Sequence, residues 1–188
     1  GSMPLIFRAG RYGAGSQTLD LLAELGIGID TSARPLFDYR RDGGPDYSRY
    51  SPEPYWLKQG EVAELPVTSV FTGGLHAVGD RLYGTDSDPS GLRGALSRLK
   101  LLSRTPLTPE GVDLAEAARG VDRALSARLP LLVFSFHSPS VVPGNTSYVR
   151  SEAEADFFHE WWEGMFAHLA ARGVAPADLG ELHGEIFA

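Results

Sequence analysis

The stretch PLIFRAGRYGAGSQTLDLLAELGIGIDTS, residues 4–32, decides the fold. A short apolar run at residues 5–7 leads into arginines and glycines, and a helical pattern follows over residues 16–25. A second apolar run at residues 27–29 then ends on Asp30. Strand, helix and strand in this order predict a βαβ unit with parallel strands.

Working outward, further strands are expected at residues 65–71 and 131–136. Helical patterns cover residues 92–102, 109–129 and 152–172. Three residues are expected to cap helix N-termini, namely Ser16, Thr108 and Ser151. Strands that alternate with helices predict an α/β protein with mostly parallel strands and flanking helices.

Composition favours one domain, residues 4–188, because 188 residues with 43% apolar content suffice for one core. We interpret Gly1 and Ser2, which precede Met3, as residues left from expression. A net charge of −7 argues against nucleic acid as a partner. No apolar run is long enough to span a membrane, and we expect a cytoplasmic protein. The absence of cysteine excludes disulfides and thiolate metal sites.

The expected strands end on polar or glycine-rich residues, namely Arg8, Asp30, the Thr72-Gly73-Gly74 triplet and His137. In parallel α/β folds the functional residues gather at the carboxyl ends of the strands. The sequence therefore predicts a site there. Alternation along the last strand places Leu132, Phe134 and Phe136 on one face, toward helices.

Residues 35–58, PLFDYRRDGGPDYSRYSPEPYWLK, form a long segment without clear periodicity. Its aromatic side chains, including Tyr39, Tyr55 and Trp56, suit the binding of flat ligands or sugar rings. The alternative is a loop whose tyrosines pack on one another and on the sheet.

The opening stretch also invites comparison with a dinucleotide-binding fingerprint, G-x-G-x-x-G directly after a strand. Here the order is Gly10-x-x-Gly13-x-Gly15, with Arg8 and Arg11 among the glycines, which disfavours a nicotinamide-dependent oxidoreductase. No pair of histidines has the spacing of a metal site.

Taken together, these segments resemble the polysaccharide deacetylase family, the metal-dependent carbohydrate esterases with a NodB-homology domain. FRAGRYG resembles the family's arginine motif, GIDTS its aspartate motif and LLVFSFHSP its histidine motif. The resemblance extends through VFSFHSPSVVPGNTSYVRSEAEADFFHEWWEGMF. It implies a partial (β/α) barrel that corresponds to the C-terminal portion of a deacetylase.

The resemblance also implies roles for individual residues. His137 would protonate the leaving amine, and Asp30 would position Arg8, whose charge tunes the catalytic base. Tyr12 would lie where a backbone N–H stabilises the oxyanion. Arg11 is a second candidate for the functional arginine, and we place it with Tyr39, Tyr55 and Trp56 as substrate-binding residues.

Two family motifs are absent from the sequence: the Asp-Asp pair that supplies the base and a metal ligand, and the His-x-x-x-His pair. The family uses a divalent metal, zinc or similar, but its ligands are not present here, so we assign no metal-binding residue. We expect a carbohydrate substrate, and self-association or a missing N-terminal half. A fragment, one chain of a split enzyme and a relic all fit this pattern. The alternative function is a non-catalytic carbohydrate-binding or assembly protein.

Overall fold

The computed structural model describes residues 4–83 and 91–187, so Gly1, Ser2 and Ala188 lie outside the described residues. The strands are β1 (Ile6–Phe7), β2 (Ile29–Asp30), β3 (Tyr55–Lys58), β4 (Val62–Glu64), β5 (Ser69–Thr72) and β6 (Ser103–Pro106). The α-helices are α1 (Ser16–Glu24), α2 (Gly79–Tyr83), α3 (Leu92–Arg98), α4 (Leu114–Ser126), α5 (Glu152–Ala171) and α6 (Leu179–Phe187). Short 3₁₀ turns cover Gly10–Tyr12, Arg40–Asp42, His76–Val78 and Ser138–Val141.

Four strands form one sheet in the order β1-β2-β4-β3. The predicted βαβ unit is confirmed, since β1 pairs parallel with β2, and β2 in turn pairs parallel with β4. Leu22 of α1 packs with Ile27 and Val62 to cover this sheet. The parallel register brings the carboxyl ends of β1, β2 and β4 to the same edge.

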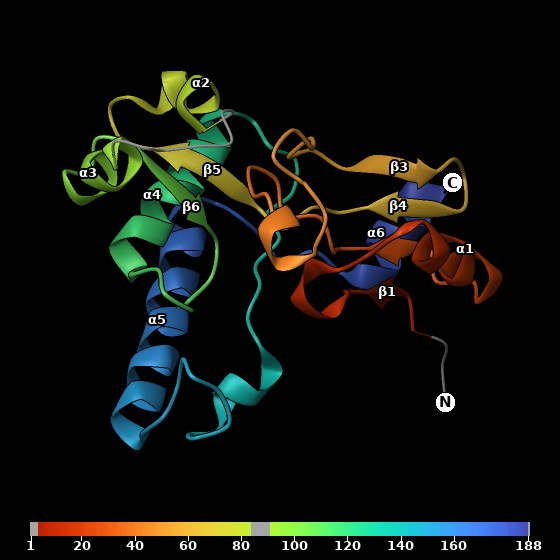
Figure 1. The fold of residues 1–188 in the computed structure, drawn as a ribbon. Coiled ribbons are helices and arrows are strands. Elements are labelled where there is room, and N and C mark those ends of the chain that lie inside the picture. Colours follow the sequence, from red (N-terminus) through yellow and green to blue (C-terminus); the bar gives the residue numbers. More distant parts are fainter. Residues whose placement is uncertain (1–3, 84–90, 188) are drawn as a thin grey trace.

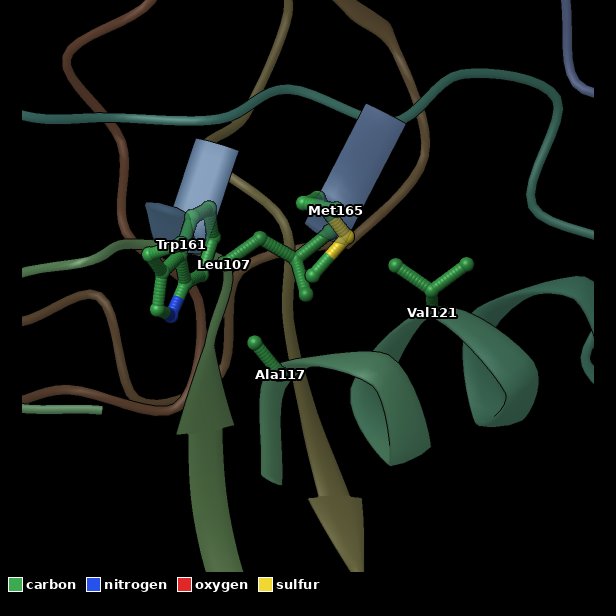
Figure 2. Close-up of a cluster of buried hydrophobic side chains, with 5 residues drawn as sticks. All are labelled: Leu107, Ala117, Val121, Trp161 and Met165. Carbon is green, nitrogen blue, oxygen red and sulfur yellow. The ribbon is translucent and has the colours of Figure 1, made fainter. Parts of the chain in front are cut away.

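A second, two-stranded sheet consists of β5 and β6, which pair antiparallel. Figure 1 shows this sheet with α4 and α5 on one side of the molecule and the four-stranded sheet with α1 on the other. Figure 2 shows the core formed by α4, α5 and the residue that follows β6, where five buried side chains meet. These are Leu107, Ala117, Val121, Trp161 and Met165.

The expected partial barrel is wrong. A barrel needs each strand to pair on both sides, but the described strands divide into two separate sheets. The strand directions also differ from the mostly parallel ones that were expected. After β3 the chain turns at Gly60, and β3 pairs antiparallel with β4. The fold is a mixed α/β arrangement with a small parallel and antiparallel sheet beside an antiparallel ribbon.

The strand predicted over residues 131–136 is wrong, because this segment belongs to neither sheet. The Thr68 N–H donates to the Val133 carbonyl at 2.9 Å, and the Ser135 N–H donates to the Leu107 carbonyl at 3.1 Å. The predicted orientation of the apolar side chains is confirmed. Leu132 and Phe134 pack against the α4–α5 core, and the Phe136 ring lies 5.5 Å from that of Trp162.

Several element boundaries differ from the expected ones. The helix predicted over residues 109–129 begins at Leu114, because the Asp113 carboxylate rather than Thr108 caps it, accepting from the Glu116 N–H at 2.7 Å. The helix predicted to start after a Ser16 cap has Gly15 in that position. The Ser151 cap of α5 is confirmed. The strand predicted over 65–71 is shorter and shifted, since β5 covers Ser69–Thr72.

The described helices include none with the length and hydrophobicity of a membrane span.

Candidate functional site

His137 lies just after the segment 131–136 and is held by the carboxylate of Glu110. Its Nδ1 lies 2.7 Å from Glu110 Oε2, and its backbone N–H donates to Glu110 Oε1 at 2.9 Å. Ser140 Oγ donates to the same Oε1 at 2.7 Å. The Glu110 side chain is only 7% exposed, whereas that of His137 is 53% exposed. This arrangement orients the imidazole and leaves Nε2 as its available nitrogen.

A pocket of about 380 Å³ adjoins the partners of His137. Glu110 lines it, as does Tyr148, whose ring stacks on the His137 imidazole at 5.5 Å between centroids. Other lining residues come from α5 and combine aromatic rings with carboxylates; they include Glu154, Phe157, Phe158, Glu160 and Trp161. Because Phe157 is 70% exposed and Tyr148 50%, both rings are open to solvent beside the pocket.

Arg8 links the carboxyl end of β1 to the segment that carries His137. Its Nε donates to Thr31 Oγ1 at 2.7 Å, and its Nη2 donates to the Phe134 carbonyl at 3.3 Å. Arg8 and His137, the first and last of the predicted strand-end residues, are therefore connected: Arg8 bonds to the Phe134 carbonyl, and His137 follows Phe134 by three residues.

Asp30 acts on Arg8 through Ser32 rather than by direct contact. Asp30 Oδ1 accepts hydrogen bonds from the Ser32 N–H and hydroxyl. The Ser32 hydroxyl oxygen in turn accepts from the Ala9 N–H at 2.8 Å. This chain fixes the backbone next to Arg8, so the residue that the resemblance pairs with Arg8 is near it but bonded elsewhere.

A second buried carboxyl group, Glu64, stands opposite Asp30 in the β2–β4 register. Both residues are 1% exposed. Burial raises the pKa of Glu64 to about 9, and the nearby charge of Asp30 contributes in the same direction. Burial also raises the pKa of Asp30, although its bonds to Ser32 oppose the shift. A pKa raised to about 9 favours the protonated form of Glu64 at neutral pH.

The Arg11–Tyr12 pair lies in a strained turn. Both residues have positive φ, 54° and 59°. The Tyr12 N–H donates to the Ala9 carbonyl at 3.2 Å, so in this conformation it is engaged within the turn rather than directed at a ligand. Arg11 itself is exposed.

The aromatic segment is mainly a packed cluster. Tyr39 stacks on Tyr12 at 5.6 Å and its hydroxyl accepts from Arg34 Nη1 at 3.0 Å. Tyr55 lies on β3 opposite Glu64, with its hydroxyl buried and without a hydrogen-bond partner. Trp56, half-buried, pairs with Ala63 across the β3–β4 hairpin. None of the contacts described places these rings against His137.

Sequence reasoning missed Glu110 and Glu64. Each had a signal: Glu110 follows the Thr108-Pro109 pair shortly after β6, and Glu64 interrupts the apolar run VAELPV. An acid inside an apolar run is rarely buried unless it is paired, and so it marks a special environment. No sequence pattern indicates which residue each of these carboxyl groups contacts.

The described residues contain no group of three or more His, Cys, Asp or Glu side chains that could hold a metal ion. No family model, curated protein or solved structure matches this chain. The resemblance to the polysaccharide deacetylases therefore remains an expectation from the motifs.

Proposed function

We propose that this chain supplies the acid histidine and the sugar-binding surface of a polysaccharide deacetylase-like hydrolase, which removes acetyl groups from an N-acetylated carbohydrate. One observation carries the proposal. His137 is exposed, yet its orientation is fixed through Nδ1 by the buried carboxylate of Glu110. A histidine held in this way is suited to general acid catalysis.

The chemistry follows from the imidazole geometry. When an amide C–N bond breaks, the departing nitrogen needs a proton. With Nδ1–H directed at Glu110, the imidazolium form carries its second proton on Nε2 and can deliver it to the leaving amine. The contact between Nδ1 and the Glu110 carboxylate fixes the ring for this transfer, as a carboxylate partner of a catalytic histidine does.

The neighbouring pocket supports a carbohydrate ligand. The exposed rings of Tyr148 and Phe157 offer apolar faces, while Glu160 offers acceptors for hydroxyl groups. Binding sites commonly combine an apolar lining with a few polar groups that fix orientation. This pocket, rather than the packed rings of residues 35–58, is the better candidate for the substrate.

The divalent metal that the resemblance implies does not fit the described residues, because no suitable cluster of donor side chains exists among them. We therefore assign no step to a metal. β1 forms one edge of the four-stranded sheet. Pairing of this edge with a second copy or another polypeptide remains part of the proposal, since exposed strand edges are usually paired or covered.

The alternative function is a non-catalytic carbohydrate-binding protein that uses the same pocket.

One experiment separates the two functions. Acetate release from N-acetylglucosamine oligomers would be measured with added zinc, together with binding of the same oligomers by calorimetry. We expect His137→Ala to lower the rate by about 10² or more, the usual scale for a general acid. His159→Ala, which removes an exposed histidine of α5, is the matched control and should retain the rate.

Binding without acetate release by the wild-type protein would favour the non-catalytic alternative. If the oligomers neither bind nor react, both functions are wrong. If His137→Ala keeps full activity, the assigned acid is wrong.

A further inference from the structure

A larger pocket, of about 730 Å³, lies away from His137, between the aromatic segment and α2. Its walls come from residues 48–52, from Leu36, from Phe71 of β5 and from α2. Three of its side chains are charged: Arg49, Asp80 and Arg81. Within the described part of the chain, Arg49 and Arg81 form no ion pair, so their charges are available to a ligand.

Two further arginines, Arg93 and Arg104, contact lining residues of this pocket. The Arg104 guanidinium lies 4.9 Å from the ring centre of Tyr83, a lining residue, and its Nη1 donates to the carbonyl of Leu36, another lining residue, at 2.7 Å. The Arg93 guanidinium lies 5.1 Å from the same Tyr83 ring. Burial lowers the pKa of Arg104, and the neighbouring Arg93 and Arg34 guanidiniums lower it further.

Two acids of the aromatic segment pair with Arg40 rather than with the arginines of the pocket. Asp38 and Asp46 both face Arg40, at 2.8 Å and 3.5 Å. Asp80 is the one carboxylate among the described lining residues. Two arginines line this pocket and two more contact its Tyr83 ring, an arrangement that attracts an anion.

The remaining lining indicates what else the ligand contains. Tyr50 is 42% exposed and, with Phe71 and Tyr83, gives the pocket an aromatic wall. Ser48 and Ser51 add hydroxyl groups. An aromatic wall accepts the apolar face of a ring, hydroxyls bond to hydroxyls, and guanidinium groups bind carboxylates in bidentate fashion. The volume lies within the range of small-molecule sites.

We propose that this pocket binds an acidic saccharide, with the carboxylate of a uronic acid held by Arg49 and Arg81 and its ring against Tyr50. The negative charge of the ligand is inferred from the arginines alone. That the ligand is a saccharide rests on the proposed function. The acidic saccharide would then be recognised at a point separate from the reacting centre at His137.

The test is calorimetric titration of the full chain at low ionic strength with digalacturonate, with neutral diacetylchitobiose and with inorganic phosphate. Digalacturonate should bind, and its affinity should fall as salt is added. Arg49→Ala and Arg81→Ala should each weaken it about tenfold, the scale of a hydrogen bond to a charged group. Arg119→Ala, which removes an exposed arginine of α4, should leave the affinity unchanged.

Three results would overturn the proposal: no binding of digalacturonate, equal binding of the neutral disaccharide, or phosphate binding as tightly as digalacturonate. His137→Ala keeps this test independent of the proposed catalysis. That variant should bind digalacturonate normally, so loss of acetate release and loss of uronate binding report on different sites.

Discussion

Glu64 and Asp30 are directly opposite each other in a parallel strand pair, and both carboxyl groups are removed from water. Glu64 Oε1 accepts the Ala33 N–H at 2.9 Å, and Tyr55 covers the pair from β3. With its pKa raised to about 9 by burial, Glu64 keeps its proton in the folded protein at neutral pH. In the unfolded chain the same group would lose its proton near pH 4.5.

A pH-dependent stability follows. Between those two values the folded state binds one proton more than the unfolded state, so the free energy of unfolding falls as pH rises, by at most about 1.4 kcal/mol per pH unit. Glu64→Gln removes this titration and keeps a neutral hydrogen-bonding group. In urea unfolding at pH 6 and pH 8, wild type should lose about 2–3 kcal/mol more than Glu64→Gln over this interval.

Glu163→Gln, a change at an exposed carboxyl group of α5, should follow the wild-type profile and serves as the control. Parallel profiles for Glu64→Gln and wild type would show that Glu64 does not hold the proton.

For single residues, the sequence predicts which side chains lie at the ends of strands or segments, but not which residues they form hydrogen bonds with. Arg8, Asp30 and His137 could be placed at strand or segment ends because an apolar run stops just before or at each of them. The partner of His137, Glu110, is 27 residues earlier in the chain. Contacts over such separations depend on how β6 and the segment 131–136 approach each other, and no local pattern encodes that approach.

At the scale of elements, the backbone conformation of Gly73 ends strand β5. Gly73 has φ +95°, and a Cβ at this position would lie 2.4 Å from the Leu101 carbonyl oxygen. The chain then turns so that the Leu75 N–H donates to that same carbonyl at 2.9 Å. Only glycine allows both the positive φ and the close approach of the 101 backbone.

Gly73→Ala should therefore destabilise the protein by about 2–4 kcal/mol, from the strained φ together with a clash against rigid backbone. The adjacent Gly74→Ala is the matched control, because no atom lies within 4 Å of its added Cβ. Urea unfolding of both variants measures the difference. Equal stability of the two would mean that the β5 end rearranges without cost.

Helices were better predicted than strands at the scale of elements. α5 was found almost whole because 20 residues of helical pattern follow a Ser cap. β3 was missed because its four residues lie inside the irregular aromatic segment. α4 was predicted to begin too early, since Pro109 and Gly111 suit a helix start but Asp113 provides the bonded cap. Strands of two to four residues carry too little periodicity to fix their bounds.

At the scale of the whole molecule, Thr68 joins the two sheets. It lies in the buried link between β4 and β5 and is 1% exposed. Its N–H donates to Val133 at 2.9 Å, and its carbonyl accepts from Leu107 at 3.0 Å. Its Oγ1 also accepts the Val133 N–H at 2.8 Å. Three distant segments therefore meet at one residue, and the barrel expectation drawn from the family resemblance does not anticipate this junction.

The side-chain bond of this junction can be removed without changing its shape. Thr68→Val is nearly isosteric but leaves the Val133 N–H without its acceptor, so we expect a loss of about 1–3 kcal/mol in the free energy of unfolding. Thr68→Ser keeps the hydroxyl and loses one methyl, at a cost of roughly 1 kcal/mol. Amide hydrogen exchange distinguishes the two: the Val133 amide should exchange faster in Thr68→Val than its global stability explains, and not in Thr68→Ser. If Val133 exchange follows global stability in both variants, the hydroxyl does not connect segment 131–136 to the sheets, and the backbone bonds alone hold the position of His137.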